Sequence, residues 1–164
     1  MRPAVLAVLV VFLFSSCTST YPYLVTTGEC NCERFVYRDE QGRIEIDVSA
    51  HYVITNRIHS TIEFVLRNKS RDSLSLKQAY LRGTSVNIHY EFNGRFQAMP
   101  FVAIAPGGSY TMTLEGSDSE MTHDPWLKIA GEKIVVEIEG MLLGLNQLAP
   151  VVLTFKPLNP KLTP

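Results

Sequence analysis

A strict alternation of apolar and polar side chains constrains this chain more than any other feature. The apolar residues between positions 44 and 54 share one parity: Ile44, Ile46, Val48, Ala50, Tyr52 and Ile54. Because successive side chains of a strand point to opposite faces of a sheet, this pattern predicts a half-buried β-strand. The same period of two recurs over residues 62–66, 86–92, 110–114, 134–138 and 151–155.

Turn residues separate these segments and predict how they are connected. Asn93-Gly94 is the strongest short hairpin signal, because both residues tolerate positive φ, so residues 85–92 should pair with residues 95–104. Several short strands within residues 33–156 predict an all-β domain, a two-sheet antiparallel sandwich. This expected domain resembles immunoglobulin-like sandwiches in architecture alone, since the Cys…Trp…Cys spacing is absent. Residues 157–164 are expected to form an extended C-terminal tail.

One segment, residues 124–130, departs from the alternation and predicts a short helical turn. Asp124 suits the cap, Pro125 the first helical position and Gly131 the exit. The helix carries Trp126, the only tryptophan of the chain. Beside apolar neighbours, Trp126 would plug the open end of the sandwich. An exposed Trp126 would instead contact a ligand or a partner, as interface hot spots do.

The N-terminus has the three parts of a secretory signal. Arg2 supplies a positive charge, Ala4 to Phe14 form an apolar run, and small residues follow at Ser15-Ser16. Such a run is too short to cross a bilayer, which needs roughly 20 apolar residues. We therefore expect residues 1–16 to be a cleaved signal peptide.

The end of that signal, Leu13-Phe14-Ser15-Ser16-Cys17, resembles the lipobox of bacterial lipoproteins. Phe14 occupies the position where leucine is usual in that family. The resemblance implies that the Cys17 thiol is diacylated, that cleavage precedes Cys17, and that Cys17 becomes the first mature residue. It implies a membrane partner through the lipid anchor and a place in the cell envelope. The residues next to Cys17, Thr18-Ser19-Thr20, include no acidic residue, which by the same resemblance favours the outer membrane.

Residues 17–32 are expected to form a lipidated tether, in which Tyr21 and Tyr23 have no core to join. The tether ends in a pair of cysteines, Cys30 and Cys32. In an oxidising envelope such a pair can form a local disulfide. The alternatives are an intermolecular disulfide, two free thiols, or a soft-metal or redox site.

The sequence shows no signature of catalysis or of nucleic-acid binding. Motifs of serine hydrolases, zinc proteases and phosphate-binding loops are absent. With 15 basic against 16 acidic residues and no basic cluster, nothing indicates nucleic acid. We expect no enzyme and no cofactor, but a membrane-anchored envelope lipoprotein whose module binds another envelope protein, a glycan or a host molecule. The alternative is a metal-handling or redox lipoprotein using Cys30, Cys32, Met121 and His123.

Overall fold

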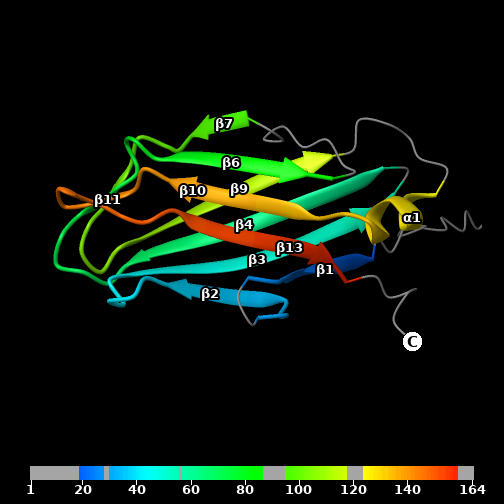
Figure 1. Cartoon of the computed structure of the whole chain (residues 1–164), viewed down its shortest axis with the longest axis horizontal. Coiled ribbons are helices and arrows are strands. Elements are labelled where there is room, and N and C mark those ends of the chain that lie inside the picture. Colours follow the sequence, from blue (N-terminus) through cyan, green and yellow to red (C-terminus); the bar gives the residue numbers. More distant parts are fainter. Residues whose placement is uncertain (1–18, 28–29, 56, 87–94, 118–123, 159–164) are drawn as a thin grey trace, which may run out of the picture.

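The computed structural model describes residues 19–27, 30–55, 57–86, 95–117 and 124–158. It is mostly β, with antiparallel strands and one short helix, which confirms the all-β class and the helical turn (Figure 1). The elements are β1 (Thr20–Val25), β2 (Arg34–Arg38), β3 (Ile44–Ile54), β4 (Ile58–Asn68), β5 (Leu74–Ser75), β6 (Tyr80–Ser85), β7 (Arg95–Ala98), β8 (Ala103–Ile104), β9 (Ser109–Ser117), α1 (Pro125–Ala130), β10 (Ile134–Glu139), β11 (Leu142–Leu143), β12 (Asn146–Gln147) and β13 (Val151–Pro157).

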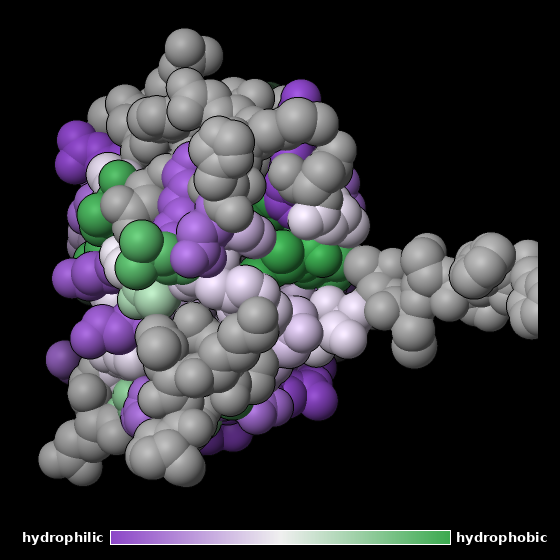
Figure 2. Space-filling model, turned by 90° about the vertical axis from the view of Figure 1, so that its right-hand side faces the viewer, coloured by the Kyte–Doolittle hydropathy of each residue, from purple (hydrophilic) through white to green (hydrophobic). Residues whose placement is uncertain are grey.

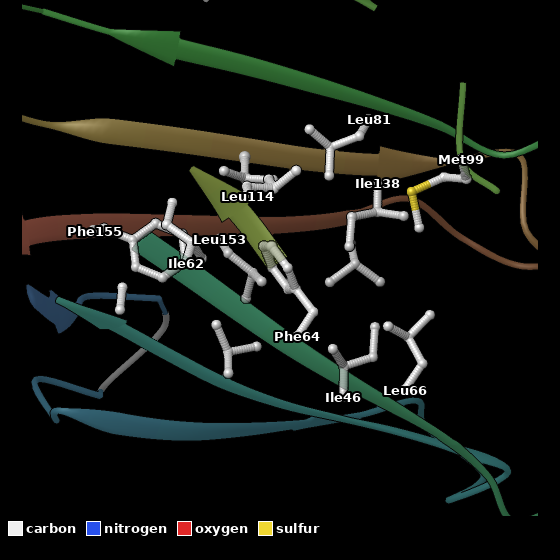
Figure 3. Packing of buried hydrophobic residues seen from close by; sticks show 14 of the residues in the cluster. Ile46, Ile62, Phe64, Leu66, Leu81, Met99, Leu114, Ile138, Leu153 and Phe155 are labelled. Atoms are coloured by element: carbon white, nitrogen blue, oxygen red, sulfur yellow. The ribbon is translucent and has the colours of Figure 1, made fainter. Parts of the chain in front are cut away.

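The long strands form where the sequence alternates. β3 pairs with β4 along its whole length, from Ile44 opposite Asn68 to Ile54 opposite Ile58. Their apolar parities point inward, and so do those of β10 and β13. Figure 3 shows the resulting core, in which Leu81, Ile138 and Leu153 of one layer face Ile46, Phe64 and Leu66 of the other. Hydrophobic burial across this interface is the main stabilising contribution.

We call β2, β3, β4 and β9 the β3 layer, and β6, β7, β10 and β13 the β13 layer. The expected separation into two sheets is not found, because β1 hydrogen-bonds to both layers. Its first half pairs with β3, with Thr20 opposite Val53, and its second half pairs with β13, with Val25 opposite Phe155. The layers therefore belong to one nine-stranded sheet that folds over on itself through β1.

The prediction of a tether over residues 17–32 is wrong for β1. Tyr23 and Val25 are fully buried in the core, and the Tyr23 hydroxyl lies 2.8 Å from Ser60 Oγ. Pro22 lacks an N–H to donate, and it lies where β1 passes from β3 to β13. Its carbonyl accepts from the backbone N–H of Leu158 at 3.0 Å. The packed domain therefore begins at Thr20, not at residue 33.

The predicted tail at 157–164 also needs correction, because β13 continues through Pro157, which pairs with Tyr23. Residues 159–164 lie outside the described part of the chain. The predicted hairpin register around Asn93-Gly94 is wrong as well. Gly83 pairs with Arg95, whereas a two-residue turn at Asn93-Gly94 would place Phe92 opposite Arg95. Residues 87–94 lie outside the described residues, and β7 ends at Ala98, before Pro100. Ile104 belongs instead to β8 of a small four-stranded sheet.

The domain has two distinct ends (Figure 1). One end, here the α1 end, holds α1, the start of β1 and the final residues of β3, β6 and β13. The opposite end, here the β11 end, holds the β2–β3 turn and the β11–β12 hairpin. Gly144 of this hairpin donates to the carbonyl of Ser73 at 3.0 Å, which ties it to the chain before β5.

The burial of β1 leads to a stability prediction. Tyr23→Ala should lower the free energy of unfolding of the mature chain by about 3–5 kcal/mol, because it removes a buried aromatic side chain and leaves a cavity. The matched control is Val152→Ala on an exposed face of β13, with an expected change within about 0.5 kcal/mol. Urea unfolding measures both. An unchanged midpoint for Tyr23→Ala would mean that residues 20–25 are a tether after all.

Candidate functional site

An aromatic cluster closes the space between the two layers at the α1 end. The ring of Tyr52 stacks on Tyr21, with centroids 5.4 Å apart, and meets Tyr23 edge-on at 5.1 Å. Trp126 in turn packs edge-on against Tyr21 at 5.2 Å. Such pairs contribute roughly 0.5–1.5 kcal/mol each beyond their buried area. Trp126 is half-buried and packs against the core, which is the arrangement that its interpretation as a plug predicts.

Tyr52 is held by one further interaction at this end. Its hydroxyl donates to the backbone carbonyl of Leu158 at 2.6 Å. Burial raises the pKa of Tyr52 to about 12, with a smaller contribution from Tyr21. Tyr52 therefore keeps its proton, and this hydrogen bond, over the physiological pH range.

The local sequence fixes where α1 begins and ends. The Asp124 carboxylate accepts from the backbone N–H of Leu127 at 3.0 Å, as expected for a helix cap, and Pro125 occupies the first turn. After the helix, the buried Glu132 accepts from Ser85 Oγ at 2.8 Å and from the backbone N–H of Val86 at 3.1 Å. Glu132 thus joins the end of α1 to the end of β6.

Cys30 and Cys32 form a disulfide, with Cα atoms 5.6 Å apart. Backbone hydrogen bonds between Val25 and Cys32 hold the segment beside β1. A disulfide offers no thiolate to a metal, and the described residues contain no cluster of three or more His, Cys, Asp or Glu that could hold one. Met121 and His123 lie outside the described residues, and so does Cys17.

A ladder of ion pairs crosses the outer face of the β3 layer. The Arg34 guanidinium donates two hydrogen bonds to the Asp47 carboxylate, from Nε to Oδ1 at 2.9 Å and from Nη2 to Oδ2. Arg67 reaches Asp47 at 3.4 Å and Glu45 at 3.1 Å. Asp47 is only 6% exposed. The hydrogen bond from Arg34 and the positive charges of Arg34 and Arg67 outweigh burial and lower the pKa of Asp47.

Two open hollows mark the surface. The first, of about 430 Å³, is lined by His59, Ser60, Thr61, Glu115, Gly116 and Ser117. In the described part of the chain, His59 makes no hydrogen bond to Glu115 or Ser117. The second, of about 550 Å³ at the β11 end, is lined by Gln78, Tyr80, Glu139, Gly140, Leu142, Gln147 and Pro150.

The second hollow combines an exposed aromatic ring with amides and a carboxylate. Tyr80 is 46% exposed, and Gln78, Gln147 and Glu139 provide polar groups around it. Gly140 has a φ of +78°, and a Cβ there would lie 2.3 Å from the carbonyl oxygen of Gln78. Only glycine therefore fits this turn, and the hollow depends on it.

Sequence reasoning identified Trp126 and the cysteine pair but missed the residues that surround them. Sequence patterns place Tyr21 and Tyr23 in a tether, and no sequence motif marks the residues that line the hollow beside Tyr80. The Tyr-x-Tyr-x-Val alternation of residues 21–25 was the available signal for β1.

Comparisons with known proteins do not assign this chain to a family. No family model matches it, and no curated protein matches it. A solved structure described as "Crystal structure of protein from Archaeoglobus fulgidus" is similar at 16% identity, over 71% of this chain and 97% of that chain, with a TM-score of 0.42. A similarity this distant carries neither fold nor function to the chain. No helix among the described residues has the length and apolarity to span a bilayer.

The lowered pKa of Asp47 predicts how stability depends on pH. A carboxyl whose folded-state pKa lies below its unfolded value stabilises the fold above the unfolded pKa, and this contribution disappears as pH falls through the folded pKa. Asp47→Asn should therefore lower the free energy of unfolding by about 1–3 kcal/mol near neutral pH. The difference from the native chain should shrink below about pH 4.

Urea unfolding near neutral pH and in acid measures this difference. The control is Glu115→Gln, an exposed carboxylate on the same face without an ion pair in the described chain. A deficit for Asp47→Asn that stays constant into acid would contradict the electrostatic origin.

Proposed function

We propose that this chain is the precursor of a lipid-anchored protein of the bacterial cell envelope. Residues 1–16 are its secretory signal, and Cys17 carries the lipid. The observation that carries the proposal is the apolar run from Ala4 to Phe14, whose last two residues begin the lipobox-like segment Leu13–Cys17. The absence of acidic residues directly after Cys17 favours the outer membrane. Acyl chains contribute about 0.8 kcal/mol per buried methylene, and two or three of them anchor a domain stably.

We further propose that the domain is a non-enzymatic binding or structural module. In this proposal the β3 and β13 layers correspond to the two sheets of an immunoglobulin-like sandwich. The core that the two layers share supports this correspondence. The β11 end offers the best surface for a partner. The exposed ring of Tyr80 beside Gln78, Gln147 and Glu139 suits a glycan or a polar segment of another envelope or host protein.

A redox role for Cys30 and Cys32 is the second candidate. The observation that favours it is that both cysteines are paired and only half-buried, so an exchanging thiol can approach them. Metal handling would require their reduction to thiolates first. Met121 and His123 remain the proposed additional ligands for that state.

The lipid anchor leads to a localisation prediction. Cys17→Ala should abolish incorporation of a labelled fatty acid and release the protein from sedimented membranes, because no acyl chain remains. The control is Cys30→Ala with Cys32→Ala, which removes the other two cysteines and should stay lipidated. Metabolic labelling and membrane flotation measure both, and density separation identifies the membrane. Firm membrane attachment of Cys17→Ala would overturn the proposal.

A further inference from the structure

The distance between Cys17 and the packed domain is short. β1 begins at Thr20, three residues after Cys17. Three residues span at most about 11 Å when fully extended. If Cys17 carries the lipid, as proposed above, the start of β1 lies within that distance of the acylated residue. The domain is then not suspended from a long tether but is held against the membrane surface.

The start of β1 also determines which end of the domain lies there. Tyr21 packs directly on Trp126, so α1 lies beside the first residues of β1. Among the described residues, two large apolar side chains are exposed at this end: Leu127 of α1 is 74% exposed, and Val86 is 64% exposed. Glu132 binds the backbone of Val86 directly after α1, which places Val86 next to the helix. Figure 2 views this end and shows green hydrophobic surface bordered by purple hydrophilic residues.

We propose that the α1 end is a membrane-contact surface, in which Leu127 and Val86 enter the interfacial region of the bilayer. Trp126 precedes Leu127 in α1 and is half-buried. Tryptophan is enriched at membrane interfaces, because one end of its ring is apolar and its N–H is polar. The exposed Lys133 supplies a long side chain whose ammonium group can reach the lipid phosphates. The lipid is the favoured occupant, since the anchor brings the bilayer to this end.

The inference also fixes the orientation of the rest of the domain. β3 runs from the β11 end to the α1 end, and its 11 residues span about 36 Å. The β11 end, with Leu145 and the Tyr80 hollow, would therefore point away from the bilayer. Leu145 is 99% exposed at the tip of the β11–β12 hairpin, and it makes a matched control for Leu127.

The test uses single-tryptophan variants of the lipidated mature protein. Trp126→Phe removes the only tryptophan while keeping an aromatic plug, and either Leu127→Trp or Leu145→Trp is then added. Each variant is reconstituted from detergent into phosphatidylethanolamine–phosphatidylglycerol vesicles with and without brominated acyl chains. Flotation first checks that the protein is attached to the vesicles, and circular dichroism checks the fold.

Brominated chains should quench the emission of the Leu127→Trp variant several-fold more than that of the Leu145→Trp variant. If both variants float but neither is quenched, or only the Leu145→Trp variant is quenched, the contact surface is refuted while the lipid anchor stands. If the wild-type protein itself fails to float, the proposed anchor fails and the inference falls with it. A second readout is the Leu127→Asp variant, which should float but lose protection of α1 against proteinase, whereas Leu145→Asp should not.

Discussion

The backbone hydrogen bonds of β1 hold the two layers of this domain together. The strand pairs with β3 through its first half and with β13 through its second half, so a single six-residue segment belongs to both layers. Tyr23 and Val25 fill the space between the layers at this side, and Tyr23 reaches across to Ser60. Without β1, the inner edges of β3 and β13 would each lose ladder partners, and buried backbone groups would be left unsatisfied.

The same strand links the fold to the proposed anchoring. The first residues of β1 carry Tyr21, which stacks on Tyr52 and receives Trp126 from α1. The interactions that close the space between the layers are therefore the ones that place α1 next to the start of β1. A lipid on Cys17 would lie within about 11 Å of the start of β1. The exposed apolar side chains of Leu127 and Val86 would then meet the bilayer. The Tyr80 hollow would then be presented on the far side, where a partner can reach it.

Sequence patterns predicted the elements that local residue spacing and capping residues determine. β3 has an uninterrupted alternation, and its predicted bounds agree with the structure. The caps of α1 are local too, so Asp124 and Pro125 predicted the helix correctly. The alternation in β1 is a weaker signal than that in β3, because β1 is short and contains Pro22. Its position also depends on partners as distant in sequence as Phe155. Asn93-Gly94 predicted that the segments on either side pair, but in the wrong register, since residues 80–83 of β6 pair with β7 rather than the residues directly before Asn93. The proposed site is likewise tertiary, since Trp126 and Tyr21 are far apart in sequence.

Hydrogen exchange of the lipidated mature protein in lipid vesicles tests the role of β1 most directly. The backbone N–H of Thr26 donates to the carbonyl of Thr154 in β13 at 2.7 Å, and that of Leu158 donates to the carbonyl of Pro22 in β1 at 3.0 Å. If β1 joins the two layers, the amides of Thr26 and Leu158 exchange as slowly as those of β3 and β4, because they open only with the whole domain. If they exchange at the rate of an unstructured peptide while β3 and β4 stay protected, residues 20–25 are a tether, and the account of both the fold and the membrane contact is wrong.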